Sequence, residues 1–272
     1  MTSRDEHKER DHEQDDGLSR ASAPAADGSV AHHTPYDPPR GPIEVVFANE
    51  HFAVLNKPSG LLSVPGRGEE KADCLASRAQ AMFPHATGPI TVHRLDMETS
   101  GLTVIGLNAE TQAKLSRQFI HRKVKKNYEA LLAGALDPCL GDEGCIELPL
   151  IVDWPNRPRH MVDFDRGKAA KTYYTVLERI ERHADYPDAG PLTRVRFRPI
   201  TGRTHQLRLH AAHAVSIIDG ACRGGLGAPI LGDPLYSDTR AHAPRLMLHA
   251  SLLCFWNPVG TDWLRFESPA GF

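Results

Sequence analysis

The sequence predicts an α+β fold built on a largely antiparallel sheet. Short apolar runs bounded by glycine, proline or polar residues recur from residue 43 to residue 250, which is typical of β-strands joined by turns. Only a few stretches have helical character, and they do not alternate regularly with the strands as in parallel α/β folds. The 272 residues, of which 40% are hydrophobic, suffice for a proper core.

The first part of the chain is expected to form a hairpin, two helices and a buried strand. Residues 43–47 and 52–56 are apolar runs separated by a polar turn, which predicts a β-hairpin. A stretch of helical character over 74–83 ends at a proline. The continuous apolar run 102–107 predicts a buried strand, and Asn108 can cap a helix that runs to about His121.

The second part of the chain adds three strands. They are predicted at 125–132, at 171–180 and at 192–198. In the last strand, Arg194, Arg196 and Arg198 share one face, and a solvated surface explains this pattern about as well as an RNA contact does.

A turn and a short helix follow that strand. Gly202 allows a tight turn, and Thr204 can cap a helix in which Leu207, Ala211 and Ala214 share one side.

The charge distribution separates a tail from one domain. Residues 1–40 hold 5 basic and 9 acidic residues with almost no large apolar ones, so we predict that they are disordered. We expect residues 41–272 to form a single domain. This domain carries a net charge of +2, although the whole chain carries −2. A mildly basic domain allows local basic surfaces but is weak evidence for a nucleic-acid partner.

Several classes of protein are disfavoured by the composition. No apolar run approaches the roughly 18 residues of a membrane span, and the N-terminus lacks the apolar stretch of a secretory signal, so we expect a cytoplasmic protein. The five cysteines form no Cys-x-x-Cys pair, which predicts thiols in a reducing compartment rather than disulfides. The scattered histidines lack the spacing of a zinc site, so we expect no metal.

The candidate site centres on Asp96, which lies in the polar turn before the predicted strand 102–107. An acid held at the mouth of a buried strand can be aimed at a ligand, although Asp96, Thr99 and Ser100 are also ordinary turn formers. The text over residues 93–102, His-Arg-Leu-Asp-Met-Glu-Thr-Ser-Gly-Leu, resembles the active-site motif of the RluA-type pseudouridine synthases. These enzymes isomerise uridine in RNA.

Further segments resemble the same family in the same order. They lie at 54–66, 125–128, 199–210, 230–236 and 245–250. The resemblance covers about residues 43–272 and implies a long mixed sheet with the Asp96 loop in a central cleft. Many relatives carry an N-terminal S4 RNA-binding domain, for which residues 1–40 are too short and too polar. The chain departs from the family pattern at 214–229, which we interpret as a surface insertion.

The resemblance implies a catalytic role for three residues. Converting uridine to pseudouridine breaks the N1–C1′ bond and rejoins the uracil through C5, so it needs no cofactor, metal or redox change. Asp96 is the catalytic carboxylate, Tyr128 lies against the target base, and Arg203 pairs with Asp96. A neighbouring positive charge favours the ionised form of a carboxyl group. These residues are compatible with attack of Asp96 on C1′, with attack on C6 and with assistance in removing the 2′ proton.

The RNA contacts are predicted from the same resemblance. The target uridine must leave the stack, and Arg94 is the candidate to fill its place. The densest basic cluster follows the Asp96 motif and can hold the phosphate backbone, although such a run is usually a solvated face. The predicted RNA-binding residues in this cluster are Arg122, Lys123, Lys125 and Lys126, and Leu246 and Leu248 are predicted to line the uracil pocket.

One further segment bears on which RNA is the substrate. Asp-Trp-Pro-Asn-Arg-Pro at 153–158 is similar to family members of dual specificity, which implies tRNA uridine 32 in the anticodon stem-loop, 23S rRNA uridine 746 in a hairpin, or both. A non-catalytic RNA-binding protein with the same fold is one alternative. A glycoside or nucleoside hydrolase is another, but it needs two acids and only Glu98 lies near Asp96. We expect a monomer.

Overall fold

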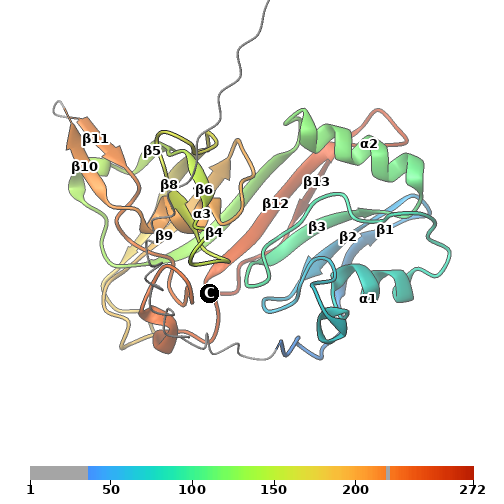
Figure 1. Ribbon diagram of the computed structural model, residues 1–272, viewed down its shortest axis with the longest axis horizontal. Helices are drawn as coiled ribbons and strands as arrows, with labels where there is room; N and C mark the ends of the chain where they lie inside the picture. The colour runs from blue at the N-terminus through green and yellow to red at the C-terminus, as the bar shows by residue number, and fades with distance from the viewer. Residues whose placement is uncertain (1–35, 219–220) are drawn as a thin grey trace, which may run out of the picture. The chain divides into compact units, whose positions relative to one another are not determined.

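Nine strands form one mixed sheet in the computed structural model, which describes residues 36–218 and 221–272. Eight strands follow the order β1-β2-β3-β12-β4-β9-β8-β5, and β13 also pairs with β12 (Figure 1). The β3–β12 pair is parallel and the other pairs are antiparallel, which confirms the predicted α+β fold. The strands are β1 (Glu44–Ala48), β2 (Phe52–Lys57), β3 (Ser100–Gly106), β4 (Lys125–Ala133), β5 (Glu143–Glu147), β8 (Lys171–Ile180), β9 (Leu192–Pro199), β12 (Leu248–Trp256) and β13 (Trp263–Glu267).

The remaining elements are two small hairpins and short helices. β6 (Leu150–Val152) pairs with β7 (His160–Val162), and β10 (Val215–Ile218) pairs with β11 (Ala221–Gly224). The α-helices are α1 (Leu75–Met82), α2 (Ala109–Ile120) and α3 (Gln206–Ala212). Single 3-10 turns occur at η1 (Glu69–Lys71), η2 (Pro138–Leu140) and η3 (Thr239–His242).

Helices α1 and α2 cover opposite faces of the β2–β3 part of the sheet (Figure 1). Successive side chains of a strand point to opposite faces, so Leu55 packs with α1 while Val54 packs with α2. This two-sided burial explains the unbroken apolar run in β2. Asn108 caps α2 as predicted, because its side chain accepts a hydrogen bond from the Thr111 N–H at 2.9 Å.

Around α3 lies the largest core cluster, against β4 and β9. Phe197 and Val195 face this core, whereas the three arginines of β9 point to the other face. There Arg194 lies 3.9 Å from Glu129, and the guanidinium of Arg198 lies 4.4 Å from the ring centre of Tyr173. The β9 arginines therefore belong to the side of the sheet away from α3, which favours the interpretation as a solvated face.

A glycine permits the parallel contact at the centre of the sheet. Gly101 has φ +113°, and a Cβ atom there would lie 2.5 Å from the backbone N and O of Ala250 in β12. An L-residue would be strained by this φ and would also collide with the neighbouring strand. The Thr-Ser-Gly-Leu text thus allows β12 to approach β3 directly after the Asp96 loop.

Two expectations need correction. Cys139 and Cys222 form a disulfide, with Cα atoms 6.2 Å apart, although free thiols were predicted; their separation of 83 residues gives no sequence signal of their proximity. The disulfide joins η2 to the β10–β11 hairpin formed by the 214–229 insertion. The domain also begins earlier than residue 41, because Tyr36 Oη donates to the Asp73 carbonyl at 2.9 Å. Residues 1–35 lie outside the described residues.

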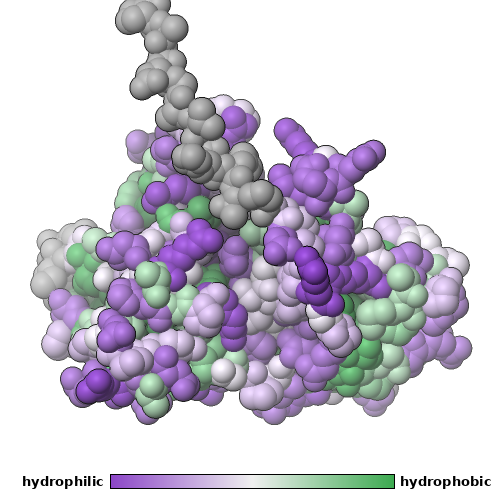
Figure 2. Space-filling model, turned by 90° about the horizontal axis from the view of Figure 1, so that it is seen from below, coloured by the Kyte–Doolittle hydropathy of each residue, from purple (hydrophilic) through white to green (hydrophobic). Residues whose placement is uncertain are grey.

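The surface is mixed in character. Figure 2 shows one face on which hydrophilic side chains predominate, with smaller hydrophobic patches between them. Within the described residues, no helix is both long and apolar enough to cross a membrane.

Candidate active site

The loop that carries Asp96 is held by the last residue of β2 and by the segment that follows this strand. The buried Lys57 ammonium group donates to three carbonyl oxygens, including that of Met97 at 2.9 Å. Ser63 Oγ donates to the Leu95 carbonyl at 2.6 Å and accepts from the Leu95 N–H at 3.1 Å. The backbone on both sides of Asp96 is thereby fixed. The 54–66 and 93–102 motifs are one structural unit.

Lys57 is a titratable group inside this unit. Burial lowers the pKa of Lys57 to about 7, and the negative charges of Asp96 and Glu98 oppose this shift. Its three carbonyl partners satisfy all three donors of an ammonium group. Lys57 therefore holds the Asp96 loop in place through its hydrogen bond to the Met97 carbonyl.

β4 forms the next wall of the site. Burial raises the pKa of Tyr128, and the negative charge of Asp96 raises it further, so Tyr128 keeps its proton at neutral pH. Burial lowers the pKa of Lys126, whose Nζ lies 5.8 Å from the ring centre of Phe119. The imidazole of His93 stacks on the same ring at 4.3 Å. The wall combines aromatic surface with a cation.

The opposite wall is the turn before α3. Gln206 Oε1 accepts hydrogen bonds from Thr201 Oγ1 at 2.8 Å and from the Arg203 N–H at 3.0 Å. The N-cap of α3 is His205, which has φ +54° and makes no side-chain cap. The predicted cap at Thr204 is therefore wrong: the Gln206 amide closes the turn, and the helix begins one residue later than a Thr204 cap implies.

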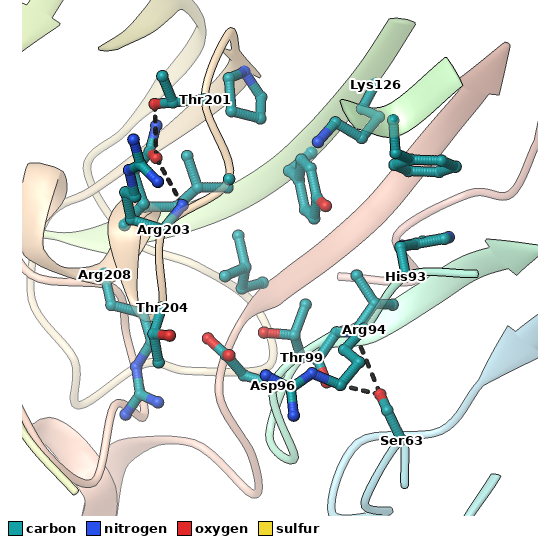
Figure 3. A pocket seen from close by; sticks show the side chains of 18 of the residues that line it. Ser63, His93, Arg94, Asp96, Thr99, Lys126, Thr201, Arg203, Thr204 and Arg208 are labelled. Atoms are coloured by element: carbon teal, nitrogen blue, oxygen red, sulfur yellow. Dashed lines mark hydrogen bonds between the residues drawn. The ribbon is translucent and has the colours of Figure 1, made fainter. Parts of the chain in front are cut away.

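Arg203 does not lie where the sequence prediction put it. Its Nε–H donates to the Ala169 carbonyl at 3.3 Å, and in Figure 3 its side chain lies beside Thr201 rather than Asp96. The negative charge of Asp96 helps to raise the pKa of Arg208, so Arg208 is a second candidate for the cation that accompanies Asp96. Figure 3 shows Asp96 and Arg94 on one side of the site and Arg208 on the other.

Arg208 is held by a buried ion pair with Asp233. Their side chains are 2% and 0% exposed, and the Arg208 Nε–H donates to Asp233 Oδ2 at 2.7 Å within a two-point contact. Burial lowers the pKa of Arg208, but Asp233 and Asp96 outweigh this and raise it. Arg208 is a permanent, oriented cation near Asp96. The Ile-Leu-Gly-Asp segment supplies its anchor.

A neutral histidine adjoins this ion pair. This histidine is His205, whose Nδ1 lies 2.7 Å from Tyr236 Oη. The same Tyr236 Oη accepts a hydrogen bond from the backbone N–H of His160 at 2.7 Å. Because the backbone N–H of His160 can only donate, the Tyr236 hydroxyl is free to donate its own proton to His205 Nδ1. Burial lowers the pKa of His205 to about 4, although Asp96 opposes the shift. Sequence reasoning did not select Asp233, His205 or Tyr236, although all three lie in the matched segments.

A cavity of about 860 Å³ separates these walls. Asp96 is the one carboxylate among the described residues that line it (Figure 3). One acid among several cations suits a polyanionic ligand and a single nucleophile. The cationic lining residues are Arg94, Arg122, Lys126, Arg203 and Arg208.

The other predicted site residues divide between the cavity and its surroundings. Leu248 lines the cavity, whereas Leu246 is 1% exposed in the main core and is absent from the lining. Lys123 and Lys125 are exposed outside it, and Lys125 Nζ lies 5.8 Å from the ring centre of Trp263. Among the described residues, no group of three or more His, Cys, Asp or Glu side chains could hold a metal ion.

Comparisons with known proteins identify the family of this chain. Residues 51–213 match the family model for RNA pseudouridylate synthases. The dual-specificity RNA pseudouridine synthase RluA of Pasteurella multocida strain Pm70 is 44% identical over 87% of this chain and 98% of that protein. Its Escherichia coli K12 counterpart is 43% identical with the same coverage. The structure of human RNA pseudouridylate synthase domain containing 1 superposes with a TM-score of 0.62 and 26% identity, covering 84% of this chain and 83% of that one.

Proposed function

This protein belongs to the RluA-type RNA pseudouridine synthases, and we propose that its target uridine lies in the anticodon stem-loop of tRNA, in a hairpin of 23S rRNA, or in both. The observation that carries the proposal is the 44% identity to a dual-specificity enzyme along 98% of that enzyme's length. The Asp-Trp-Pro-Asn-Arg-Pro text at 153–158, on the rim of the cavity, supports it.

Asp96 is the catalytic carboxylate of this proposal. In the reaction the N1–C1′ bond breaks, the uracil turns, and a C5–C1′ bond forms; C5 loses a proton and N1 gains one. A carboxylate close to the sugar can act as the nucleophile in such a step. Two-carboxylate hydrolysis of a glycosidic bond needs a second acid across the cavity, and the described lining offers Asp96 alone.

Arg208 and Tyr128 support Asp96. The oriented guanidinium of Arg208 stabilises the negative charge of the carboxylate, so we assign Arg208 the role that the sequence suggested for Arg203. Tyr128 keeps its proton because of burial and the nearby Asp96 charge. It can therefore stack on the uracil and offer a neutral hydroxyl. Arg203, at the exposed rim, is better placed for the RNA backbone.

The remaining cations hold the RNA around the flipped nucleotide. Arg94 is exposed on the Asp96 loop and lines the cavity, so it can occupy the space that the uridine leaves. Arg122 and Lys126 line the opposite side, from the end of α2 and from β4. All the cavity residues named above come from one chain, and we propose that the enzyme acts as a monomer. We also propose the cytoplasm as the place of the reaction, where tRNA and rRNA are found.

The test uses transcripts of the anticodon stem-loop and of the 23S hairpin, with pseudouridine mapped after incubation with wild-type protein. We expect modification of one or both. Asp96→Asn should abolish turnover and leave RNA binding largely intact, because the amide keeps the size of the side chain but cannot act as a carboxylate nucleophile.

Glu98→Gln is the matched control, since Glu98 is on the same loop but is not part of the cavity lining. It should retain turnover. Pseudouridine formation by Asp96→Asn would refute the assigned role of Asp96. Modification of neither transcript, with activity on other RNA, would refute the proposed substrates.

A further inference from the structure

The β6–β7 hairpin presents an aromatic side chain at the rim of the active-site cavity. Its turn, residues 153–159, brings Pro158 into the cavity lining, and the first residue of β7 is anchored by the hydrogen bond from the His160 N–H to Tyr236 Oη. Trp154 in this turn is 65% exposed. The hairpin is thus fixed to the site while its tryptophan faces solvent.

Exposure alone identifies nothing, because single exposed apolar residues are common on protein surfaces. The orientation of Trp154 distinguishes it. The Arg157 guanidinium carbon lies 4.0 Å from the centre of the Trp154 ring, and the Arg157 Nε–H donates to the Trp154 carbonyl at 3.0 Å. The turn is closed by the Asp153 N–H, which donates to the Arg159 carbonyl at 3.0 Å, and by the Asn156 amide on the Asp153 carboxylate.

The charge around the ring favours a polyanion. Among the described residues, neither Arg157 nor Arg159 has a carboxylate partner within salt-bridge distance, whereas Arg166 on the following loop pairs with Asp163 at 2.7 Å. The guanidinium of Arg159 lies over the Tyr236 ring at 5.4 Å. Within the described part of the chain, Arg157 over the tryptophan ring and Arg159 at the end of the same turn are therefore cations without an acidic partner.

We propose that Trp154 is a stacking site for an unpaired base of the RNA substrate, with Arg157 covering one face of its ring. Unpaired loop bases are recognised by stacking on aromatic side chains and guanidinium planes. Extruding the target uridine leaves its loop neighbours without a stacking partner, and the rim of the cavity is where such a neighbour emerges. This inference rests on the proposed hairpin substrates. It adds a specificity contact outside the reaction centre.

The test compares kcat and KM of the wild type, Trp154→Ala, Trp154→Tyr and Phe164→Ala on each transcript. Stacking of one base on an aromatic residue corresponds to a loss of about 5- to 150-fold in binding after alanine substitution. We expect Trp154→Ala to raise KM by that factor with kcat unchanged, and Trp154→Tyr to restore most of the loss. Phe164, 73% exposed after the same hairpin, is the matched control and should leave KM unchanged.

A second measurement does not depend on turnover. The sequence holds three tryptophans, so Trp256→Phe with Trp263→Phe leaves Trp154 as the only tryptophan, whose emission is selected by excitation outside the absorption of tyrosine. RNA should quench its fluorescence, and abasic sites placed along the loop should abolish the quenching at one position. Unchanged KM in Trp154→Ala, an equal loss in Phe164→Ala, or emission unaffected by RNA would each overturn the stacking site. If neither transcript is modified, the substrate proposal fails, and quenching by total tRNA or rRNA still decides the role of Trp154.

Discussion

Replacing Gly101 by alanine should destabilise the protein more than the same change at Gly134, although both glycines have nearly the same positive φ, which an alanine adopts only with strain. Their φ angles are +113° and +112°, and an added Cβ meets nothing within 4 Å at Gly134 but the Ala250 backbone at 2.5 Å at Gly101. The positive φ costs about 1–3 kcal/mol at either site. Overpacking adds about 1–3 kcal/mol at Gly101 alone. We expect losses of about 2 kcal/mol for Gly134→Ala and about 4 kcal/mol for Gly101→Ala.

Urea unfolding of both variants measures these losses of stability. Single-turnover assays on the transcript that the wild-type enzyme modifies measure the effect of each substitution on catalysis. Gly101 follows the Asp96 loop directly and pairs with Ala250, so relief of the collision must move the loop or β12. A misplacement of about 1 Å can cost on the order of 100-fold in rate. Gly101→Ala should therefore be slow as well as unstable, whereas Gly134→Ala should keep its rate. Equal losses of stability and rate in the two variants would refute the reasoning.

Three further predictions concern charged groups. Arg208→Ala should reduce kcat strongly and lower the free energy of unfolding by about 3–5 kcal/mol, because it leaves the buried Asp233 carboxylate unpaired. Arg203→Ala should mainly raise KM. Lys57→Met should lower kcat, because the Met97 carbonyl beside Asp96 loses its donor. The free energy of unfolding should fall as the pH drops from 6.5 toward 4, because histidines of the unfolded chain then bind protons while the buried imidazoles of the folded protein stay neutral. At pH 5.5 each such histidine should lower the free energy of unfolding by about 1.4 kcal/mol. The buried histidines with a pKa lowered to about 4 are His205, His210 and His249.

The controls for these predictions are specific. Equal kcat in Arg208→Ala and Arg203→Ala would contradict the role of Arg208, and Arg208→Lys separates loss of charge from loss of the two-point contact with Asp233. Lys71→Met is the control for Lys57→Met, since Lys71 makes only a surface ion pair of 3.9 Å; full activity of Lys57→Met would exclude its supporting role. Urea midpoints that stay constant between pH 7.5 and 5.5 would contradict the histidine prediction.

Local patterns in the sequence determined most of the secondary structure. The apolar runs of β2 and β3 and the cap at Asn108 lie within a residue or two of their predicted places, because side-chain periodicity and capping act between near neighbours. The Asp96 motif also located the cavity. A turn rich in polar residues before a buried strand places its carboxylate at the end of the sheet in any fold that buries the strand.

Long-range contacts were decided only by the tertiary structure. Leu246 and Leu248 are two residues apart, yet only Leu248 lines the cavity, because β12 begins at Leu248. The Cys139–Cys222 disulfide depends on where an insertion folds back, which no local spacing encodes.

The choice between Arg203 and Arg208 has the same origin. Arg203 lies in the turn before α3 and Arg208 lies within the helix, so the directions of the two side chains depend on where α3 begins. That start is set by Gln206, which bonds to Thr201 and Arg203 in the turn, and by the buried partner of Arg208 at Asp233. The sequence suggested an arginine of this segment as the partner of Asp96 only through the family resemblance. The packing of α3 against Asp233 makes Arg208 the better candidate for that role.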